Sequence, residues 1–348
     1  MPKPLAVSYS SVLDWRTCEQ RYDYRYVQKI RPKVRYAALE LGTIIHDYLS
    51  VYYRAGLQKK LSSEDARKAH TRALRSLRDA TDSIRSLAET ARDLGAEDQA
   101  AALLAIPNTA RDLMQAYYRV HGQDDFKEHR IMLVEASFEL RVKRGVVLPG
   151  RIDLVTENNQ GFWLWEHKTT GSVPRADSRF RDLQTLIYAV ALEEVHGIKP
   201  IGIIWNYIRT ARPHSPALLQ SGALSTAKNQ ITTVDLCQAA IQQHGHDPRL
   251  YRPFMRQVEV RERQDMFPRY TLPISASENI LMRDYLHSVE AIETARATEG
   301  YIPVRNIQAA CNWCPFLKLC QAAILGGDTD VVMREHFVKD STKKGGDR

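Results

Sequence analysis

Three strand-like runs joined by short turns, within residues 131–170, constrain the fold of this chain more than any other feature. The runs are IMLVEASFELRV, VVLPGRIDLVT and GFWLWEHKT, and the turns contain Arg144-Gly145 and Asn158-Asn159-Gln160-Gly161. Short turns rich in Gly and Asn join antiparallel neighbours, because these residues adopt the backbone conformations that tight hairpins require. The pattern therefore predicts three antiparallel strands in sequence order.

Helical spacing of apolar residues predicts helices on both sides of these strands. One helix, from about residue 38 to 53, carries His46. Residues 62–120 read as helices divided at Pro107, and we interpret them as an insertion. The other predicted elements are helices over about 177–196, 235–243 and 275–297 and strands at IGIIWNYI and FMRQVEVRER. Together they predict an α/β fold with a mixed central sheet flanked by helices.

Two carboxylates and a lysine are predicted to share one face of the sheet. Glu166 and Lys168 project to the same side of their strand, because alternate side chains share a face. A hairpin through the Asn-Asn-Gln-Gly turn places Asp153 beside them. Oxygen ligands of this kind suit Mg²⁺, which keeps coordination positions open for water and substrate. The alternative is a cross-strand salt bridge on a solvated sheet, although the apolar flanking strands argue against solvation.

Four short motifs, in this order, resemble those of the PD-(D/E)XK nuclease superfamily, and within it the RecB-like branch. They are LGTIIH at 41–46, GRIDLV at 150–155, EHK at 166–168 and QTLIY at 184–188. Each motif is short, but their order and approximate spacing match the superfamily. The resemblance implies a restriction-endonuclease-like core, with a mixed central sheet between helices.

The resemblance also assigns roles to the residues of these motifs. The implied ligands of Mg²⁺ or Mn²⁺ are His46, Asp153, Glu166 and the main-chain carbonyl of His167. Lys168 is the implied catalytic lysine. Gln184 and Tyr188 share a helix face and are implied to contact the DNA backbone or to position the lysine. Glu135 lies on a neighbouring predicted strand but matches no motif, so we interpret it as structural or as supporting the site.

The five cysteines are too sparse for a disulfide scaffold, and a reducing compartment keeps them as thiols or metal ligands. Cys311, Cys314 and Cys320 lie close together in CNWCPFLKLC, and Cys18 is the candidate for a fourth ligand. This arrangement resembles that of AddB-type nucleases and CRISPR-associated RecB-like exonucleases. In those families, one cysteine before the nuclease core and three after it hold a 4Fe-4S cluster. Four thiolates also serve zinc, which the spacing does not exclude. Cys237 reads as a small buried hydrophobe.

Lysine and arginine exceed aspartate and glutamate by 49 to 41, a net charge of +8, which favours a polyanionic partner such as DNA. The candidate DNA contacts are Arg21, Tyr22, Arg151, Ser225 and Lys228. Arg21 and Tyr22 belong to the tyrosine-rich and arginine-rich segment RYDYRYV, where aromatic side chains stack on bases in single-strand binders. The alternative for this segment is aromatic packing around the metal site.

These observations predict a metal-dependent DNA nuclease, most simply an exonuclease on single-stranded or end-exposed DNA, in recombination, repair or phage DNA processing. The alternatives are an endonuclease or nickase with the same site, and a non-catalytic DNA-binding subunit whose metal cluster is structural. No Walker A motif occurs, so any helicase activity would belong to a partner. No apolar run of about 18 residues occurs, so we expect no membrane and a cytoplasmic location, in the host if the chain is phage-encoded.

We expect a single nuclease domain over residues 1–348, with a cysteine-bound cluster that joins its two ends. Its expected parts are a basic N-terminal segment with Cys18 (1–36), the helical insertion (57–122), the catalytic core (130–210), the cysteine segment (299–325) and a disordered tail (340–348).

Overall fold

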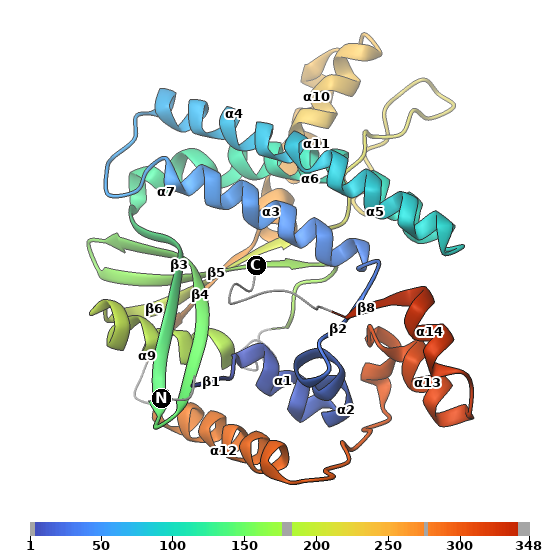
Figure 1. Ribbon diagram of the computed structural model, residues 1–348. Helices are drawn as coiled ribbons and strands as arrows, with labels where there is room; N and C mark the ends of the chain where they lie inside the picture. Colours follow the sequence, from blue (N-terminus) through green and yellow to red (C-terminus); the bar gives the residue numbers. More distant parts are fainter. Residues whose placement is uncertain (1–3, 176–182, 275–277, 340–348) are drawn as a thin grey trace.

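A computed structural model describes residues 4–175, 183–274 and 278–339 of the chain (Figure 1). Its strands are β1 (Leu5–Ala6), β2 (Ile30–Pro32), β3 (Arg130–Lys143), β4 (Val146–Asn158), β5 (Gly161–Thr170), β6 (Pro200–Arg209), β7 (Arg269–Pro273) and β8 (Phe337–Lys339). Its α-helices are α1 (Tyr9–Thr17), α2 (Glu19–Tyr22), α3 (Ala37–Arg54), α4 (Ser63–Asp79), α5 (Thr81–Asp93), α6 (Glu97–Tyr117), α7 (Gln123–Glu128), α9 (Leu183–His196), α10 (Val234–Gln243), α11 (Pro248–Arg261), α12 (Glu278–Ala297), α13 (Leu317–Leu325) and α14 (Thr329–His336).

A six-stranded mixed sheet forms the centre of the molecule, in the order β1-β4-β5-β6-β7, with β3 also paired to β4. The short turns join β3, β4 and β5 as antiparallel neighbours, as their composition predicts. β5 and β6 run parallel, so the chain must cross over between them, and α9 lies in that connection. The predicted α/β class, with a mixed sheet between helices, is confirmed.

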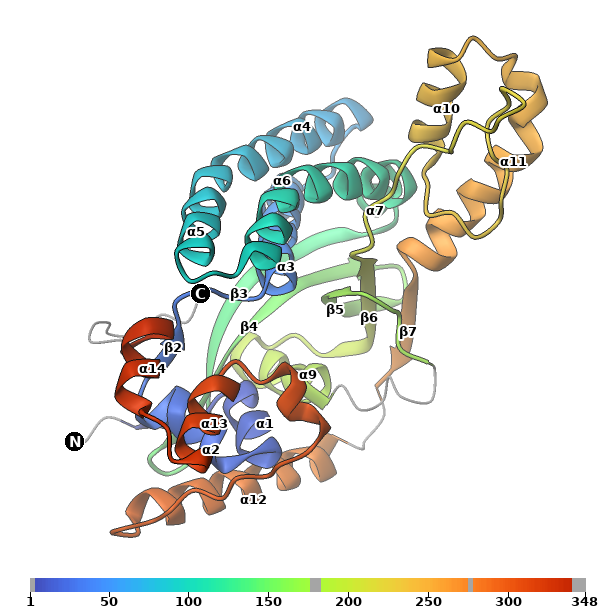
Figure 2. The ribbon, with the colours of Figure 1, turned by 90° about the vertical axis from the view of Figure 1, so that its right-hand side faces the viewer.

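Helices cover both faces of the sheet (Figures 1 and 2). Trp165 and Ile204 belong to the core shared with α3, α4, α5 and α6. Their neighbours Leu164 and Ile203 belong to the core shared with α9 and α12. Adjacent residues of a strand point to opposite faces, so these strands are apolar on both sides.

The predicted division of the helical insertion at Pro107 is wrong. The helix α6 runs from Glu97 to Tyr117 through this proline, and the breaks lie instead at Ala80 and between Asp93 and Glu97. Proline removes one backbone donor and normally ends or kinks a helix. Here the neighbouring turns are buried against α3, α4 and α5, and this packing holds the helix together.

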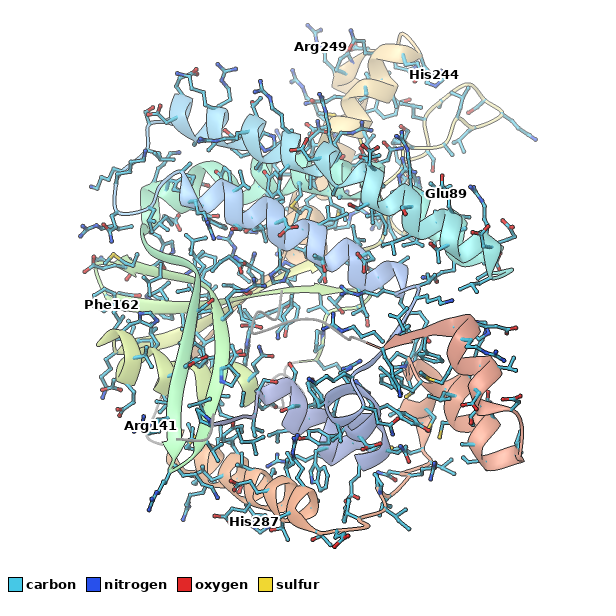
Figure 3. The ribbon with its side chains drawn as sticks, in the orientation of Figure 1. Glu89, Arg141, Phe162, His244, Arg249 and His287 are labelled. Atoms are coloured by element: carbon cyan, nitrogen blue, oxygen red, sulfur yellow. The ribbon has the colours of Figure 1, made fainter. Side chains whose placement is uncertain are left out.

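The predicted strand FMRQVEVRER is also wrong, because these residues lie in helix α11 and the turn after it. Asp247 caps the helix by accepting from the Arg249 N–H, and Pro248 occupies its first turn. Tyr251, Phe254 and Val258 are buried at helical spacing. With α10, this helix forms an arm beyond the sheet (Figure 2), and the labels His244 and Arg249 mark it in Figure 3.

The two ends of the chain meet in a small second sheet. β2 pairs with β8 in antiparallel register, over a core that includes Tyr24, Phe316 and Leu319. The expected tail at 340–348, and the first residues of the helices predicted from 177 and 275, lie outside the described residues. No helix in the described part of the chain combines the length and apolar character needed to cross a membrane.

Candidate active site

Helix α3 approaches β5 closely because Gly42 has no side chain. A Cβ atom at Gly42 would lie 2.9 Å from Thr169 Oγ1, and Thr169 directly follows the EHK motif. One turn further along α3, His46 faces the sheet, with its Nδ1 3.6 Å from Asp153 Oδ1. The glycine of the first motif therefore sets the distance between the helix that carries His46 and the strands that carry the carboxylates.

Three side chains from three different elements form the candidate metal centre. The ligand atoms of His46, Glu135 and Asp153 all lie within 4.8 Å of one another, and no other such group occurs among the described residues. Glu135 comes from β3, and its backbone is left-handed, with φ of +50°. This conformation is costly for a residue other than glycine in a strand, and such strain clusters at functional sites. The sequence carried no signal for Glu135 beyond an acidic residue in an apolar run.

Burial shifts all three side chains toward their neutral forms. It raises the pKa of Asp153 to about 7, and the nearby Glu135 charge adds to this effect. Burial also raises the pKa of Glu135, although Arg151, whose Nε lies 2.7 Å away, opposes the shift. The pKa of His46 is lowered, again chiefly by burial. A neutral imidazole and two carboxylates in a poorly solvated site suit a divalent cation, whose charge would offset the cost of burying them.

The main chain of His167 contacts two members of the metal centre. Its N–H donates to Asp153 Oδ2 at 2.8 Å. A hydrogen bond with the His167 backbone raises the pKa of His46, so the ring donates and the His167 carbonyl oxygen accepts. The carbonyl that the resemblance assigns to the metal therefore lies beside His46.

Glu166 and Lys168 lie on the same face of β5, and Lys168 Nζ is 2.7 Å from Glu166 Oε1. Glu166 is buried and its charge raises the pKa of His46, although its carboxylate lies outside the three-residue metal centre. The three side chains predicted as metal ligands are therefore divided between two groups. His46 and Asp153 lie in the metal centre, whereas Glu166 pairs with Lys168.

Gln184 and Tyr188 on α9 contact each other and lie next to this site. A side-chain hydrogen bond joins them. The pKa of Tyr188 is raised to about 12, chiefly by burial and secondly by the nearby charge of Glu166. Gly150 of the GRIDLV motif makes room for this arrangement. A Cβ there would lie 2.3 Å from Phe138 Cζ and 3.0 Å from Tyr188 Cζ.

Of the five candidate DNA contacts, Arg151 borders the metal centre through its ion pair with Glu135. Arg21 pairs with the buried Asp14 at 2.7 Å. The Tyr22 ring is buried edge-on against Trp15, which favours packing over base stacking.

Ser225 and Lys228 lie in the long loop of the arm. The Ser225 N–H donates to the Ala217 carbonyl, and the Lys228 carbonyl accepts from Arg261 of α11. These contacts place the loop against α11, and no hydrogen bond or ion pair described for either residue involves the metal centre.

In the folded chain, Cys18 and Cys311 lie close enough to Cys314 for their charges to affect it. Burial raises the pKa of Cys314, and the charges of Cys18 and Cys311 raise it further. Residues 301–308 pack along α1 and α2, where the Glu19 carboxylate accepts from the Val304 N–H at 2.9 Å. Cys320 forms a side-chain hydrogen bond with Arg305. Cys237 is buried in a separate small core of the arm, as expected of a packing residue.

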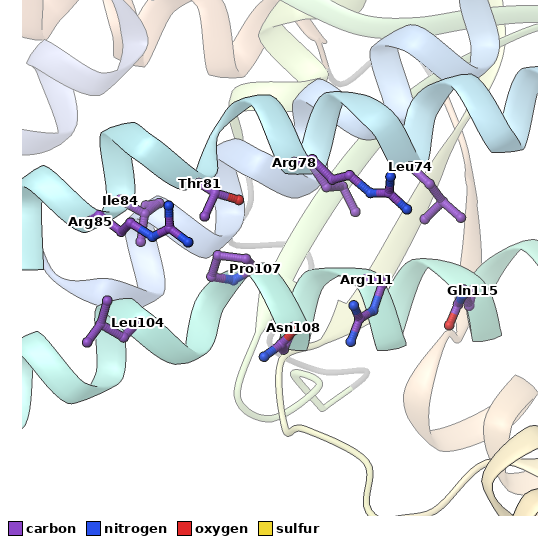
Figure 4. A pocket seen from close by; sticks show the side chains of 11 residues that line it. Leu74, Arg78, Thr81, Ile84, Arg85, Leu104, Pro107, Asn108, Arg111 and Gln115 are labelled. Carbon is purple, nitrogen blue, oxygen red and sulfur yellow. The ribbon is translucent and has the colours of Figure 1, made fainter.

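A groove of about 420 Å³ lies in the helical insertion, apart from these residues (Figure 4). Arg78 from α4 and Arg111 from α6 lie on its two sides, and Pro107 of α6 also lines it. None of its lining residues belongs to the metal centre or to the four motifs.

The comparison with known families agrees with this geometry. The family model of the PD-(D/E)XK nuclease superfamily matches residues 6–321, nearly the whole chain. The chain belongs to this superfamily, and membership implies metal-dependent hydrolysis of phosphodiester bonds in nucleic acid. A search of the curated proteins found no match.

Proposed function

We propose that this chain is a DNA exonuclease of the RecB-like branch, dependent on Mg²⁺ or Mn²⁺ and acting on single-stranded or end-exposed DNA. The observation that carries the proposal is the convergence of His46, Glu135 and Asp153 beside the Glu166–Lys168 pair. The exonuclease mode and a role in recombination, repair or phage DNA processing follow from the motif resemblance. A cytoplasmic location and a helicase or recombination partner belong to the same proposal.

The donor set fits a hard divalent cation. Two carboxylates and an imidazole would hold the cation, and the His167 carbonyl would add a neutral oxygen. When bound, the cation would act as a Lewis acid and would lower the pKa of the water molecule that it binds. Glu135 thus joins the implied ligands, in a position that the motifs did not indicate.

Lys168 and the α9 residues serve the substrate. Glu166 holds the Lys168 ammonium at 2.7 Å, where its charge offsets negative charge that develops on the phosphate. Gln184 holds the hydroxyl of Tyr188 beside the same carboxylates, so that this edge of the site is ordered before DNA binds.

We also propose that Cys18, Cys311, Cys314 and Cys320 hold a 4Fe-4S cluster that joins the N-terminal and C-terminal segments. Their side chains are partly exposed thiols, and the effect of the Cys18 and Cys311 charges on the pKa of Cys314 supports a shared site. A cluster closed by Cys18 pins the N-terminal helices against the C-terminal segment, a structural role in the way that metal sites stabilise small folds. Zinc is the alternative occupant.

The nuclease proposal is tested with end-labelled linear and circular single-stranded DNA in Mn²⁺. The wild type is compared with Lys168→Ala and with Lys199→Ala, a surface control whose lysine pairs with Glu193. We expect the wild type and the control to shorten linear DNA from its ends, Lys168→Ala to be inactive, and EDTA to abolish cleavage. Equal cleavage by Lys168→Ala would refute the site assignment. Cleaved circles would indicate an endonuclease, and DNA binding without cleavage a non-catalytic subunit.

The cluster is tested by absorbance of protein purified without oxygen. A band near 400 nm in the wild type, lost in Cys314→Ala, supports iron and sulfur. A colourless wild type that contains zinc would establish the alternative. A brown, fully folded Cys314→Ala would refute the ligand assignment.

A further inference from the structure

The α3 side of β5, the strand of the EHK motif, contains a polar network next to the metal centre. The ring of His167 lies on the α3 side of β5, where it is 3% exposed and its centroid is 6.0 Å from that of the His46 ring. It stacks on Tyr53 of α3, with centroids 5.7 Å apart and ring planes 7° apart. Its Nδ1 lies 2.9 Å from Nδ2 of Asn206 on the adjacent strand β6. His167, whose main chain contacts Asp153 and His46, is therefore held in place by the contacts of its side chain with Tyr53 and Asn206.

The contacts of Asn206 determine how it meets His167. Arg269 of β7 donates from Nε to Asn206 Oδ1 at 3.1 Å. Arginine can only donate, so the amide oxygen must face it and the NH₂ group must face His167. The His167 Nδ1 then accepts, and its proton resides on Nε2. Burial lowers the pKa of His167 well below its usual value, which agrees with a neutral ring.

An ion pair between Arg269 and Asp125 anchors this arrangement to α7, directly after the helical insertion. Arg269 donates to both carboxylate oxygens of Asp125 on α7, with its second bond at 2.8 Å. The Tyr117 hydroxyl of α6 accepts from Arg269 at 2.7 Å and from Asn206 at 2.9 Å. Tyr117 therefore donates to Tyr53, which donates to Asp125 at 2.7 Å. Each of these buried groups has a partner, as a rigid network requires.

We propose that Asn206, held by Arg269, Asp125 and Tyr117, is a positioning residue that fixes the His167 peptide and through it the metal ligands Asp153 and His46. The inference rests on the proposed metal site and adds a role for the helical insertion, which supplies Tyr117, and for α7 directly after it, which supplies Asp125. Residues that orient metal ligands from behind typically change metal affinity by about 10–100-fold when they are replaced.

The test measures Mn²⁺ binding by calorimetry and electron paramagnetic resonance without DNA, using the full chain. Asn206→Asp keeps the shape but replaces the donor that faces His167 with an acceptor. We expect its Mn²⁺ affinity to fall by about 10–100-fold in a folded protein. We also expect the ¹⁵N shifts of the His167 ring to show the proton on Nε2 in the wild type and on Nδ1 in the variant.

A milder pair of variants decides the matter if Asn206→Asp does not fold. Tyr117→Phe removes one buried hydroxyl from the network. Tyr48→Phe removes one from α3 that instead bonds His70 at 2.6 Å, outside the network. We expect only Tyr117→Phe to weaken Mn²⁺ binding, by up to about tenfold.

Two outcomes would overturn the proposal. One is wild-type Mn²⁺ affinity in folded Asn206→Asp, and the other is an equal effect of the two tyrosine variants. A wild type that binds no Mn²⁺ would instead refute the proposed metal site itself, and the positioning role with it.

Discussion

Gly42→Ala tests the close approach of α3 to β5 that brings His46 over the carboxylates. Alanine inside a helix is more stable than glycine by about 1 kcal/mol. The new Cβ would lie 2.9 Å from Thr169 Oγ1, closer than side chains normally pack. Overpacking of this kind costs about 1–3 kcal/mol. We therefore expect Gly42→Ala to lower the free energy of unfolding by about 1 kcal/mol, the difference between the two effects.

Removing the opposing hydroxyl reverses the sign of this effect. In a Thr169→Ala background, the atom nearest to the new Cβ of residue 42 is the Cβ of residue 169. These two atoms would lie 4.0 Å apart, which is an ordinary contact distance. The helix preference then acts alone, and Gly42→Ala should stabilise the protein by about 1 kcal/mol. The two substitutions are thus expected to be coupled by about 2 kcal/mol, well above the deviation from additivity of distant sites.

Urea unfolding of the wild type, both single variants and the double variant measures this coupling, at one pH and without metal. The comparison requires similar urea dependence in all four proteins, so that midpoints report stability. Equal stabilisation by Gly42→Ala in both backgrounds would refute the close approach of the helix, and with it our account of the motif glycine.

Three further predictions concern the same site and its support. Gly150→Ala places a Cβ 2.3 Å from the Phe138 ring and should cost about 2–3 kcal/mol, measured by urea unfolding; wild-type stability would contradict this close approach of Phe138 to the strand. Because the pKa of Asp153 is raised to about 7 in the folded state, the metal-free protein should lose stability as pH rises from about 4 to 7. Thermal unfolding in EDTA should show this slope, and Asp153→Asn should lack the part due to this carboxyl; identical slopes would contradict the shift. Asp125→Ala leaves the largely buried Arg269 without its anionic partner and should cost about 3–5 kcal/mol, measured by urea unfolding. A loss below about 1 kcal/mol would show that the pair is solvated.

The local parts of the active site followed from short-range patterns. Asn-Gly-rich turns and strand alternation predicted the hairpin that sets Asp153 beside the EHK motif, and helical spacing predicted the helix of His46. These features depend on residues within one or two turns of each other, so the chain specifies them locally. The failures also have local causes. Alternating residues in FMRQVEVRER suggested a strand, yet the Asp247 cap and helical spacing of the buried residues prevail.

Other features depend on packing between distant segments. Pro107 does not end its helix, because the surrounding turns are buried on three neighbouring helices. Cys18 lies near Cys314 in the fold, and residues 301–308, which contact α1 and α2, connect the two segments. Asn206 and Arg269 matched no motif, since their roles arise from the register of β5, β6 and β7.

The metal centre shows most clearly which features the sequence determined by itself and which depended on tertiary packing. Sequence patterns alone identified the kind of chemistry, because carboxylates, a lysine and a histidine occur in an order that resembles a nuclease superfamily. They indicated Asp153 beside His46 but did not identify Glu135 as the second carboxylate of this group. That depends on how α3 packs across the sheet and on the left-handed backbone at Glu135, which turns its side chain toward Asp153. His46 lies 89 positions before Glu135 and 107 before Asp153, and distances of a few ångströms over such separations are set by tertiary packing, which local patterns do not encode.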